Sequence, residues 1–184
     1  MENKKESTLI QSVKIISVLS LICVVVALLL AFVNSITKDV IKENAERESR
    51  EAVLAIFPDG DKVENFDVDG REVSAVLKGS EILGYCVNSS ASGFGGEIET
   101  IVGIGSDGKV CGVKIISMSE TPGVGSKTKS DSFLERYIGK EGTLTVGENV
   151  DGITGATISS KAVTEAVNKA LALEIDIEAL LSAN

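Results

Sequence analysis

An uninterrupted apolar run near the N-terminus constrains this chain more than any other feature. Ile15–Val33 contains no charged residue, no glycine and no proline. As an α-helix this run would extend about 28 Å, which matches the roughly 30 Å hydrocarbon core of a bilayer. It is longer than the apolar part of a cleaved signal peptide, and no A-x-A cleavage pattern follows it. We therefore expect an uncleaved, single-pass membrane anchor rather than a signal peptide.

The sequence around this run predicts four segments but does not orient them. We expect an N-terminal segment at 1–14, the transmembrane helix at 15–33, a stalk helix at 34–60 and a domain at 61–184. The stalk has no glycine or proline before Pro58-Asp59-Gly60, and it could equally be the first helix of the domain. Lysines or arginines flank the run on both sides, so the positive-inside rule does not decide the orientation. They are Lys4, Lys5, Lys14, Lys38, Lys42, Arg47 and Arg50.

Composition excludes several classes of function. The net charge of −9 argues against nucleic-acid binding, which needs a basic face. The three cysteines have neither metal-ligand spacing nor the even number of a disulfide framework, so we expect no metal site. Cys86 and Cys111 could pair, although buried free thiols are the favoured interpretation. The chain has no histidine and no C-x-x-C motif, so redox chemistry would require a bound cofactor.

The region after residue 60 changes to the alternating pattern of strands. Turn signals at Asp69-Gly70 and Ser106–Lys109 fit antiparallel hairpins, and helices are expected at 132–138 and 159–173. We therefore predict an α+β fold, an antiparallel sheet with packed helices. The expected strands are Val63–Val68, Glu72–Leu77, Ile82–Asn88, Glu97–Ile104, Val110–Met118 and Thr143–Val146.

Two loops between these strands have unusual compositions. In the first, Gly93, Gly95 and Gly96 would let a ligand approach the backbone, although a simple hairpin turn is the commoner explanation. In the second, Pro122-Gly123 predicts a type II turn that presents Glu120 and Thr121 as a hydrogen-bonding pair. Lys127 and Lys129 follow closely and could neutralise a phosphate.

The segment Asp151–Thr157 precedes the last long predicted helix. Several hydroxyl side chains, at Thr154, Thr157, Ser159 and Ser160, gather at the expected helix N-terminus, with Gly155 and Ala156 leaving space beside them. Helix N-termini bind anions through free N–H groups and the helix dipole. Helix capping is the alternative explanation, because serine and threonine are favoured N-cap residues. From the residues alone, the interpretation stops at an anion site or a cap.

Taken together, the motifs resemble a known family. Gly84-Tyr85, Gly93–Glu99, Glu120–Gly125 and Thr154–Thr157 occur in the order and spacing of the FMN-binding domain of the G subunit of the Rnf electron-transport complex. The C subunit of the sodium-pumping NADH:quinone reductase is a more distant relative. The resemblance covers nearly the whole chain, including the N-terminal membrane helix.

The resemblance implies a covalent flavin. In that family a flavin transferase joins FMN to a threonine through a phosphodiester bond, at a motif D-x-x-[ST]-G-A-[ST]. Thr157 matches the acceptor, and Asp151, Thr154, Gly155 and Ala156 match the other motif positions. Near the isoalloxazine ring we expect Tyr85, Phe94 and the Gly95-Gly96 backbone, with Glu120 and Thr121 as polar contacts and Lys129 near the phosphate.

The resemblance also implies a place in a membrane complex. The chain would be an electron-carrier subunit of an Rnf-type ferredoxin:NAD+ oxidoreductase that exports Na+ or H+, with no independent catalysis. Its partners would be the other integral membrane, iron–sulfur and flavin subunits. The 1–14 segment would be cytoplasmic and the domain would lie outside the cytoplasm. Two alternatives remain: the equivalent subunit of a Na+-translocating NADH:quinone reductase, and a non-redox anchored binding module in which Thr157 is only a helix cap.

Overall fold

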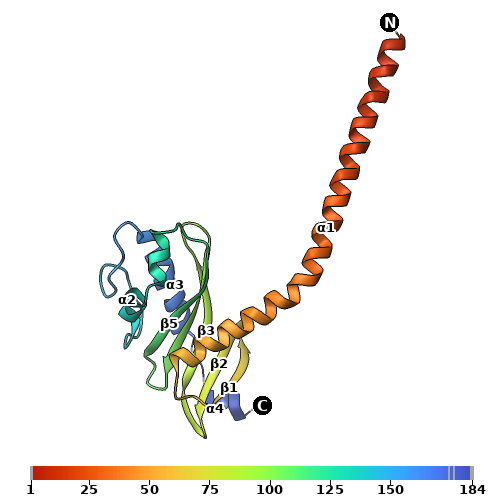
Figure 1. The fold of residues 1–184 in the computed structure, drawn as a ribbon. Coiled ribbons are helices and arrows are strands. Elements are labelled where there is room, and N and C mark those ends of the chain that lie inside the picture. Colours follow the sequence, from red (N-terminus) through yellow and green to blue (C-terminus); the bar gives the residue numbers. More distant parts are fainter. Residues whose placement is uncertain (1, 174, 176, 183–184) are drawn as a thin grey trace. The chain divides into compact units, whose positions relative to one another are not determined.

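The computed structural model describes residues 2–173, 175 and 177–182. Helix α1 is continuous from Glu2 to Ile56, and the chain divides between Arg47 and Glu48 into two compact units (Figure 1). In the first unit the apolar side chains are exposed, as Leu28 is at 65%. In the described part of the chain this is the one helix long and apolar enough to cross a membrane, with a mean hydropathy of 3.1 in its most apolar window.

The second unit contains a five-stranded antiparallel meander. Its strands are β1 (Lys62–Val68), β2 (Arg71–Lys78), β3 (Glu81–Ser92), β4 (Glu97–Gly105) and β5 (Val110–Met118), hydrogen-bonded in chain order. Asp69 and Gly70 have φ values of 54° and 74°, as the predicted two-residue turn between β1 and β2 requires. The α+β prediction is confirmed, because each strand pairs with its sequence neighbour through a short turn.

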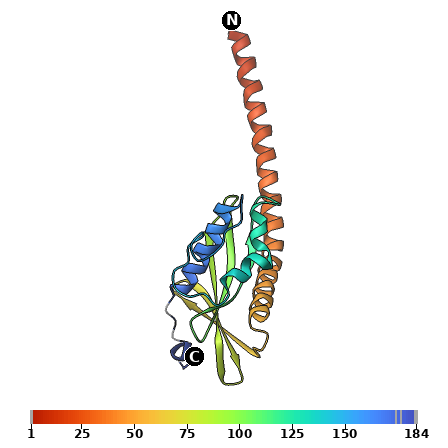
Figure 2. The same cartoon turned by 90° about the vertical axis from the view of Figure 1, so that its left-hand side faces the viewer.

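Each face of the sheet is covered by a different set of helices. On one face, α3 (Thr157–Leu171) packs along the strands with α2 (Asp131–Leu134), and the two single-turn helices η1 (Gly125–Lys129) and η2 (Glu135–Tyr137) connect to α2 (Figures 1 and 2). This face holds the larger core, with Phe133, Tyr137 and Val163 fully buried. The main hydrophobic core therefore lies between the sheet and α3.

The opposite face of the sheet receives the last turns of α1. Ala52, Val53 and Phe57 form a smaller core there with residues of β2, β3 and β4. Gly103 and Gly112 are paired across β4 and β5, and a Cβ atom on Gly103 would collide with the Ile56 side chain. Because neither glycine has a side chain, the Ile56 side chain packs directly against the strand backbone at these two positions. The last turns of the predicted stalk helix belong to the second unit.

One predicted strand is wrong. Residues 143–146 form no strand; only an isolated bridge joins Val146 to Val150. Leu144 is buried, and the Asn168 side chain both accepts a hydrogen bond from the Leu144 N–H and donates one to its carbonyl, each at 2.8 Å. The alternating pattern does bury Leu144, but the Leu144 backbone is hydrogen-bonded by a side-chain amide on α3 rather than by a neighbouring strand.

Other boundaries shift without changing the fold. β3 extends to Ser92, so most of the expected serine-rich loop is strand and only 93–96 forms the turn. Helix α3 begins at Thr157 and ends at Leu171, earlier at both ends than predicted. The predicted 132–138 helix is split into α2 and η2. A short C-terminal helix, α4 (Ile177–Ser182), had no counterpart in the sequence prediction.

Candidate functional site

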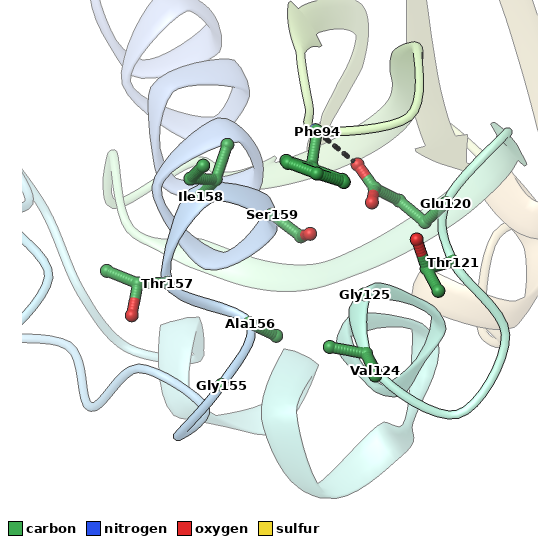
Figure 3. A pocket seen from close by; sticks show the side chains of 10 residues that line it. All are labelled: Phe94, Glu120, Thr121, Val124, Gly125, Gly155, Ala156, Thr157, Ile158 and Ser159. Atoms are coloured by element: carbon green, nitrogen blue, oxygen red, sulfur yellow. Dashed lines mark hydrogen bonds between the residues drawn. The ribbon is translucent and has the colours of Figure 1, made fainter.

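A cavity of about 470 Å³ lies where three segments meet. The segments are the turn between β3 and β4, the loop that follows β5, and the N-terminus of α3 (Figure 3). The size falls within the range of small-molecule sites. It is lined by Phe94, Glu120, Thr121, Val124, Gly125, Gly155, Ala156, Thr157, Ile158 and Ser159.

The glycine turn is closed by the Glu120 carboxylate. Within the turn, the Gly93 N–H donates to the Gly96 carbonyl at 2.7 Å. Glu120 Oε1 accepts hydrogen bonds from the N–H groups of Phe94 at 2.7 Å and Gly95 at 3.4 Å. A Cβ atom on Gly93 would collide with this same oxygen, which explains why a glycine is needed there. Glu120 therefore fixes the turn that presents Phe94 to the cavity.

The loop after β5 contains the predicted type II turn. The Val124 N–H donates to the Thr121 carbonyl at 3.2 Å, and Gly123 has the positive φ of 77° that this turn needs at its third position. Ser126 Oγ also accepts from the Gly123 N–H at 2.8 Å. The turn sets Val124 at the wall of the cavity, opposite the start of α3.

The N-terminus of α3 is open. Ala156 is the N-cap residue and makes no side-chain capping bond; Thr157 is the first residue of the helix and is exposed. Within the described part of the chain, the N–H groups of Thr157, Ile158 and Ser159 have no hydrogen-bond acceptor. The capping alternative for Thr157 is therefore wrong. Free N–H groups on a helix of this length attract an anion.

Other contacts hold the segment before α3 in place. Ser160 Oγ accepts a hydrogen bond from the Ile153 N–H at 3.1 Å, so this buried hydroxyl reaches back over the helix start. Arg136 donates to the Asp151 carbonyl at 2.6 Å, and its guanidinium lies 5.4 Å from the centre of the Phe133 ring. Gly155 has a φ of 83°, a conformation that favours glycine. The approach to Thr157 is therefore fixed by contacts that leave the Thr157 hydroxyl unused.

The structure brings some of the predicted site residues together and leaves others apart. Phe94, Glu120, Thr121, Gly155, Ala156 and Thr157 line the cavity. Gly95 and Gly96 belong to the glycine turn, where both lie close to Ser119. Asp151 and Thr154 are exposed just before the helix. Lys129 is exposed on η1 and does not line the cavity.

Tyr85 lies in a different place. It sits on β3, paired with Ile104 of β4, and lines a second cavity of about 710 Å³ with residues such as Glu81, Ser106 and Ile175. Burial raises the pKa of its hydroxyl above the usual value.

Four residues that line the first cavity were not among the predicted site residues. Val124, Gly125, Ile158 and Ser159 come from segments whose approach to one another depends on the tertiary fold. One sequence feature could have pointed to Ile158: it is an apolar residue in the first turn of a helix whose apolar stripe lies elsewhere. In the structure its side chain is 53% exposed. With Phe94 at 70% and Val124 at 44% exposed, it forms an unusually open apolar rim.

The cavity suits a ligand with an aromatic part and an anionic part. Phe94, Val124 and Ile158 offer an apolar wall, the start of α3 offers free N–H groups, and Thr157 offers an exposed hydroxyl. In Figure 3 the Thr157 side chain lies on the far side of the start of α3 from Glu120 and points away from it. An anionic group would therefore be drawn toward α3 and away from the Glu120 carboxylate.

Comparisons with known proteins agree with this description. The model of the FMN-binding domain family matches residues 93–172, which include every residue lining the cavity. The G subunit of the proton-translocating ferredoxin:NAD(+) oxidoreductase complex of Clostridium ljungdahlii is 34% identical, over 83% of this chain and 86% of that protein. The G subunit of the Na(+)-translocating ferredoxin:NAD(+) oxidoreductase complex of Acetobacterium woodii is 33% identical, over 84% of this chain and 87% of that protein. Among solved structures, NqrC of Shewanella oneidensis matches with a TM-score of 0.47 and 23% identity, over 55% of each chain.

Proposed function

The chain belongs to the family of the G subunits of ion-translocating ferredoxin:NAD(+) oxidoreductase complexes, and on that premise we propose that it is the FMN-bearing electron carrier of such a complex. The flavin would be attached to Thr157 through its phosphate. The bound FMN would accept and release electrons one at a time, while the protein sets its position and surroundings.

One observation supports the attachment site above the others. Thr157 places a free, exposed hydroxyl beside three unpaired backbone N–H groups at the mouth of an apolar cavity. Those N–H groups would bind the phosphate oxygens and hold the phosphorus next to Thr157 Oγ1. A flavin transferase would form the phosphodiester from an activated flavin phosphate, such as a flavin dinucleotide. The hydroxyl proton and the nucleotide half would leave.

The rest of the cavity fits the remainder of FMN. Phe94, Val124 and Ile158 would cover the apolar surface of the isoalloxazine ring, and Thr121 and Glu120 offer polar atoms at its far end. Because the oxidised ring is neutral, it can lie near the Glu120 carboxylate, whereas the phosphate cannot. The charge distribution thus supports one orientation of the cofactor, with the phosphate at α3.

The apolar helix α1 would anchor the carrier in the membrane. Its exposed apolar side chains require an apolar environment, and its length is enough to span one. We propose that residues 61–184 lie on the extracytoplasmic side and contact the other subunits of the complex. Cys111 provides a test, because it is exposed in this domain. A membrane-impermeant maleimide should label it in intact cells; labelling only after lysis would place the domain in the cytoplasm.

The attachment proposal has a direct test. Coexpression with a working flavin transferase should give a band that fluoresces under ultraviolet light after denaturing gel electrophoresis. Thr157→Ala should abolish this band, and Thr157→Ser should retain it because a hydroxyl remains. Thr143→Ala is a matched control, since Thr143 is exposed and lies outside the cavity. Fluorescence that survives Thr157→Ala would show that the acceptor is another residue.

The same test addresses the alternative of a non-redox binding module, which predicts no fluorescent band in the wild-type chain. The relatives also differ in coupling ion, since one is named for protons and the other for Na(+). For this chain we propose coupling to one of these two ions through the whole complex.

A further inference from the structure

Glu120 uses only half of its carboxylate in the fold. Oε1 accepts the hydrogen bonds of the glycine turn, from the N–H groups of Phe94 and Gly95. Oε2 is buried and has no hydrogen-bond partner among the described residues. A buried acceptor left without a partner is unfavourable and is rare in native proteins. An atom of this kind at the edge of a cavity points to a donor on the ligand.

Ser159 is a second unpaired polar group at the same place. Its side chain is only 2% exposed, lines the cavity, and makes no hydrogen bond to any described residue. In Figure 3 its hydroxyl points toward Glu120. The two groups flank Gly125: a Cβ atom there would collide with Glu120 Oε2 and lie 2.7 Å from Ser159 Oγ. Both atoms therefore lie against the backbone of Gly125, in space that a side chain at residue 125 would occupy.

The hydrogen-bonding properties of Glu120 Oε2 and Ser159 Oγ match one arrangement of donors and acceptors on a ligand. A carboxylate only accepts hydrogen bonds, whereas a serine hydroxyl can donate one. Side by side, they match a ligand edge that offers an N–H donor next to a carbonyl acceptor. An imide presents this pattern, and the pyrimidine end of an oxidised flavin has one, with N3–H between two carbonyl groups. A phosphate does not fit, because it would meet the carboxylate charge without offering a donor.

We propose that Glu120 Oε2 and Ser159 Oγ form the subsite that binds the imide edge of the flavin ring. Glu120 Oε2 accepts from N3–H, and Ser159 Oγ donates to a neighbouring ring carbonyl. The inference deepens the proposed function and rests on it, since it takes the ligand to be a flavin. It also assigns Glu120 a double role, because its two oxygens hold the glycine turn and the ring at once.

The test separates ring recognition from covalent attachment. The full-length chain in detergent, made without flavin transferase, is titrated with riboflavin and with 3-methylriboflavin, and the quenching of flavin fluorescence is measured. Riboflavin has no phosphate, so the titration does not depend on bond formation at Thr157. The methyl group removes the N3–H donor, and we expect it to weaken binding by about tenfold or more, as for the loss of a hydrogen bond to a charged group.

Variants assign the effect to the two side chains. Glu120→Gln keeps an acceptor for the turn but can place an amide donor against N3–H, so the preference for riboflavin should fall to about twofold or less. Ser159→Ala should weaken binding of both flavins by several-fold. Ser106→Ala, a serine in the second cavity, should leave both affinities unchanged.

Two results would overturn the subsite. One is a wild-type chain that binds both flavins equally or binds riboflavin too weakly to measure. The other is a preference for riboflavin that persists undiminished in Glu120→Gln while Ser159→Ala binds like wild type. If the gel band at Thr157 is present in either case, the attachment proposal stands and only the subsite is lost. Absence of the band would instead count against the proposed function.

Discussion

Two cavities in the described part of the domain are alike in several respects, and they differ in the features that favour binding of a cofactor. Both lie beside hairpin turns of the sheet and both include glycine and an aromatic residue: Phe94 in the first cavity, Tyr85 in the second. Only the first also includes the N-terminus of a long helix, with free N–H groups and the unused hydroxyl of Thr157. Both cavities contain glycines and an aromatic ring, but only the first has free helix N–H groups of the kind that bind anions.

A second difference concerns the polar atoms of the two cavities. In the first, Glu120 Oε2 and Ser159 Oγ are without partners among the described residues, so a ligand would complete the hydrogen bonding of the site. In the second, the Tyr85 ring packs against the main core, and burial raises the pKa of its hydroxyl. The first cavity therefore has polar atoms whose hydrogen bonds a bound ligand would supply, which is the property expected of a binding site.

Filling each cavity in turn should reveal the largest difference between the two. Val124→Trp places a large ring on the wall of the first cavity and should lower the yield of covalent flavin by about tenfold or more, because the isoalloxazine ring loses its space. Ile82→Trp makes the same change in the second cavity and should leave the yield unchanged. In-gel fluorescence normalised to protein measures both. Equal losses in the two variants would contradict the placement of FMN in the first cavity.

Disturbing the glycine turn should have the next largest effect. Gly93→Ala puts a Cβ atom where Glu120 Oε1 lies and only 3.0 Å from the Gly96 carbonyl, so we expect a loss of roughly 1–3 kcal/mol in unfolding free energy. Gly96→Ala is the control, since its nearest contact would be the Ser119 Cβ at 3.1 Å, and it should lose less than about 1 kcal/mol. Chemical denaturation in detergent measures the difference. An equal loss in the two variants would contradict the role given to Glu120.

The two tyrosines should differ more modestly. Tyr137 is fully buried beneath α3, and its hydroxyl lies 2.8 Å from Thr164 Oγ1, so Tyr137→Phe should lower the unfolding free energy by about 1 kcal/mol. Tyr85→Phe, at the second cavity, should change it by no more than about 0.5 kcal/mol. Both variants should still acquire flavin. A larger loss in Tyr85→Phe than in Tyr137→Phe would contradict the view that the Tyr85 hydroxyl contributes little to the stability of the fold.

Tyr137 should also contribute a decline in stability at alkaline pH. Burial raises its pKa from 10.0 to about 12, so its stabilising contribution is complete below pH 10 and is lost as the pH rises toward 12. Cys86 behaves in the same direction, because burial raises its pKa from 9.0 to about 12. Between pH 9 and 11 the wild type should lose roughly 1 kcal/mol more than Tyr137→Phe. Parallel curves for the two proteins would contradict this assignment.

The sequence predicted features that depend on local chemistry. The hairpin at Asp69-Gly70 and the type II turn at Pro122-Gly123 follow from residues that tolerate particular φ values, and both are present. The five strands of the sheet follow from alternation and from these turns. The expected strand at Thr143–Val146 failed because the Asn168 side chain, far along the chain, bonds the Leu144 backbone instead.

The candidate site was harder to predict, because its walls come from distant segments. The sequence pointed to Phe94, Glu120 and Thr157, each within a recognisable motif, and the structure places all three around one cavity. Ile158 and Ser159 lie next to Thr157 in the chain, but which of them faces the cavity depends on how α3 packs on the sheet. Tyr85 was grouped with Phe94 by motif, whereas the antiparallel register sets it opposite Ile104 and away from the glycine turn.

Mass spectrometry of the wild-type chain, produced with a working flavin transferase, is the most direct test for covalent FMN on Thr157. The intact mass should exceed that of the polypeptide by one FMN less one water. The tryptic peptide from Glu141 to Lys161 should contain this added mass, and fragmentation should place it on Thr157. An unmodified chain, or an adduct on Thr154, Ser159 or Ser160, would contradict the account.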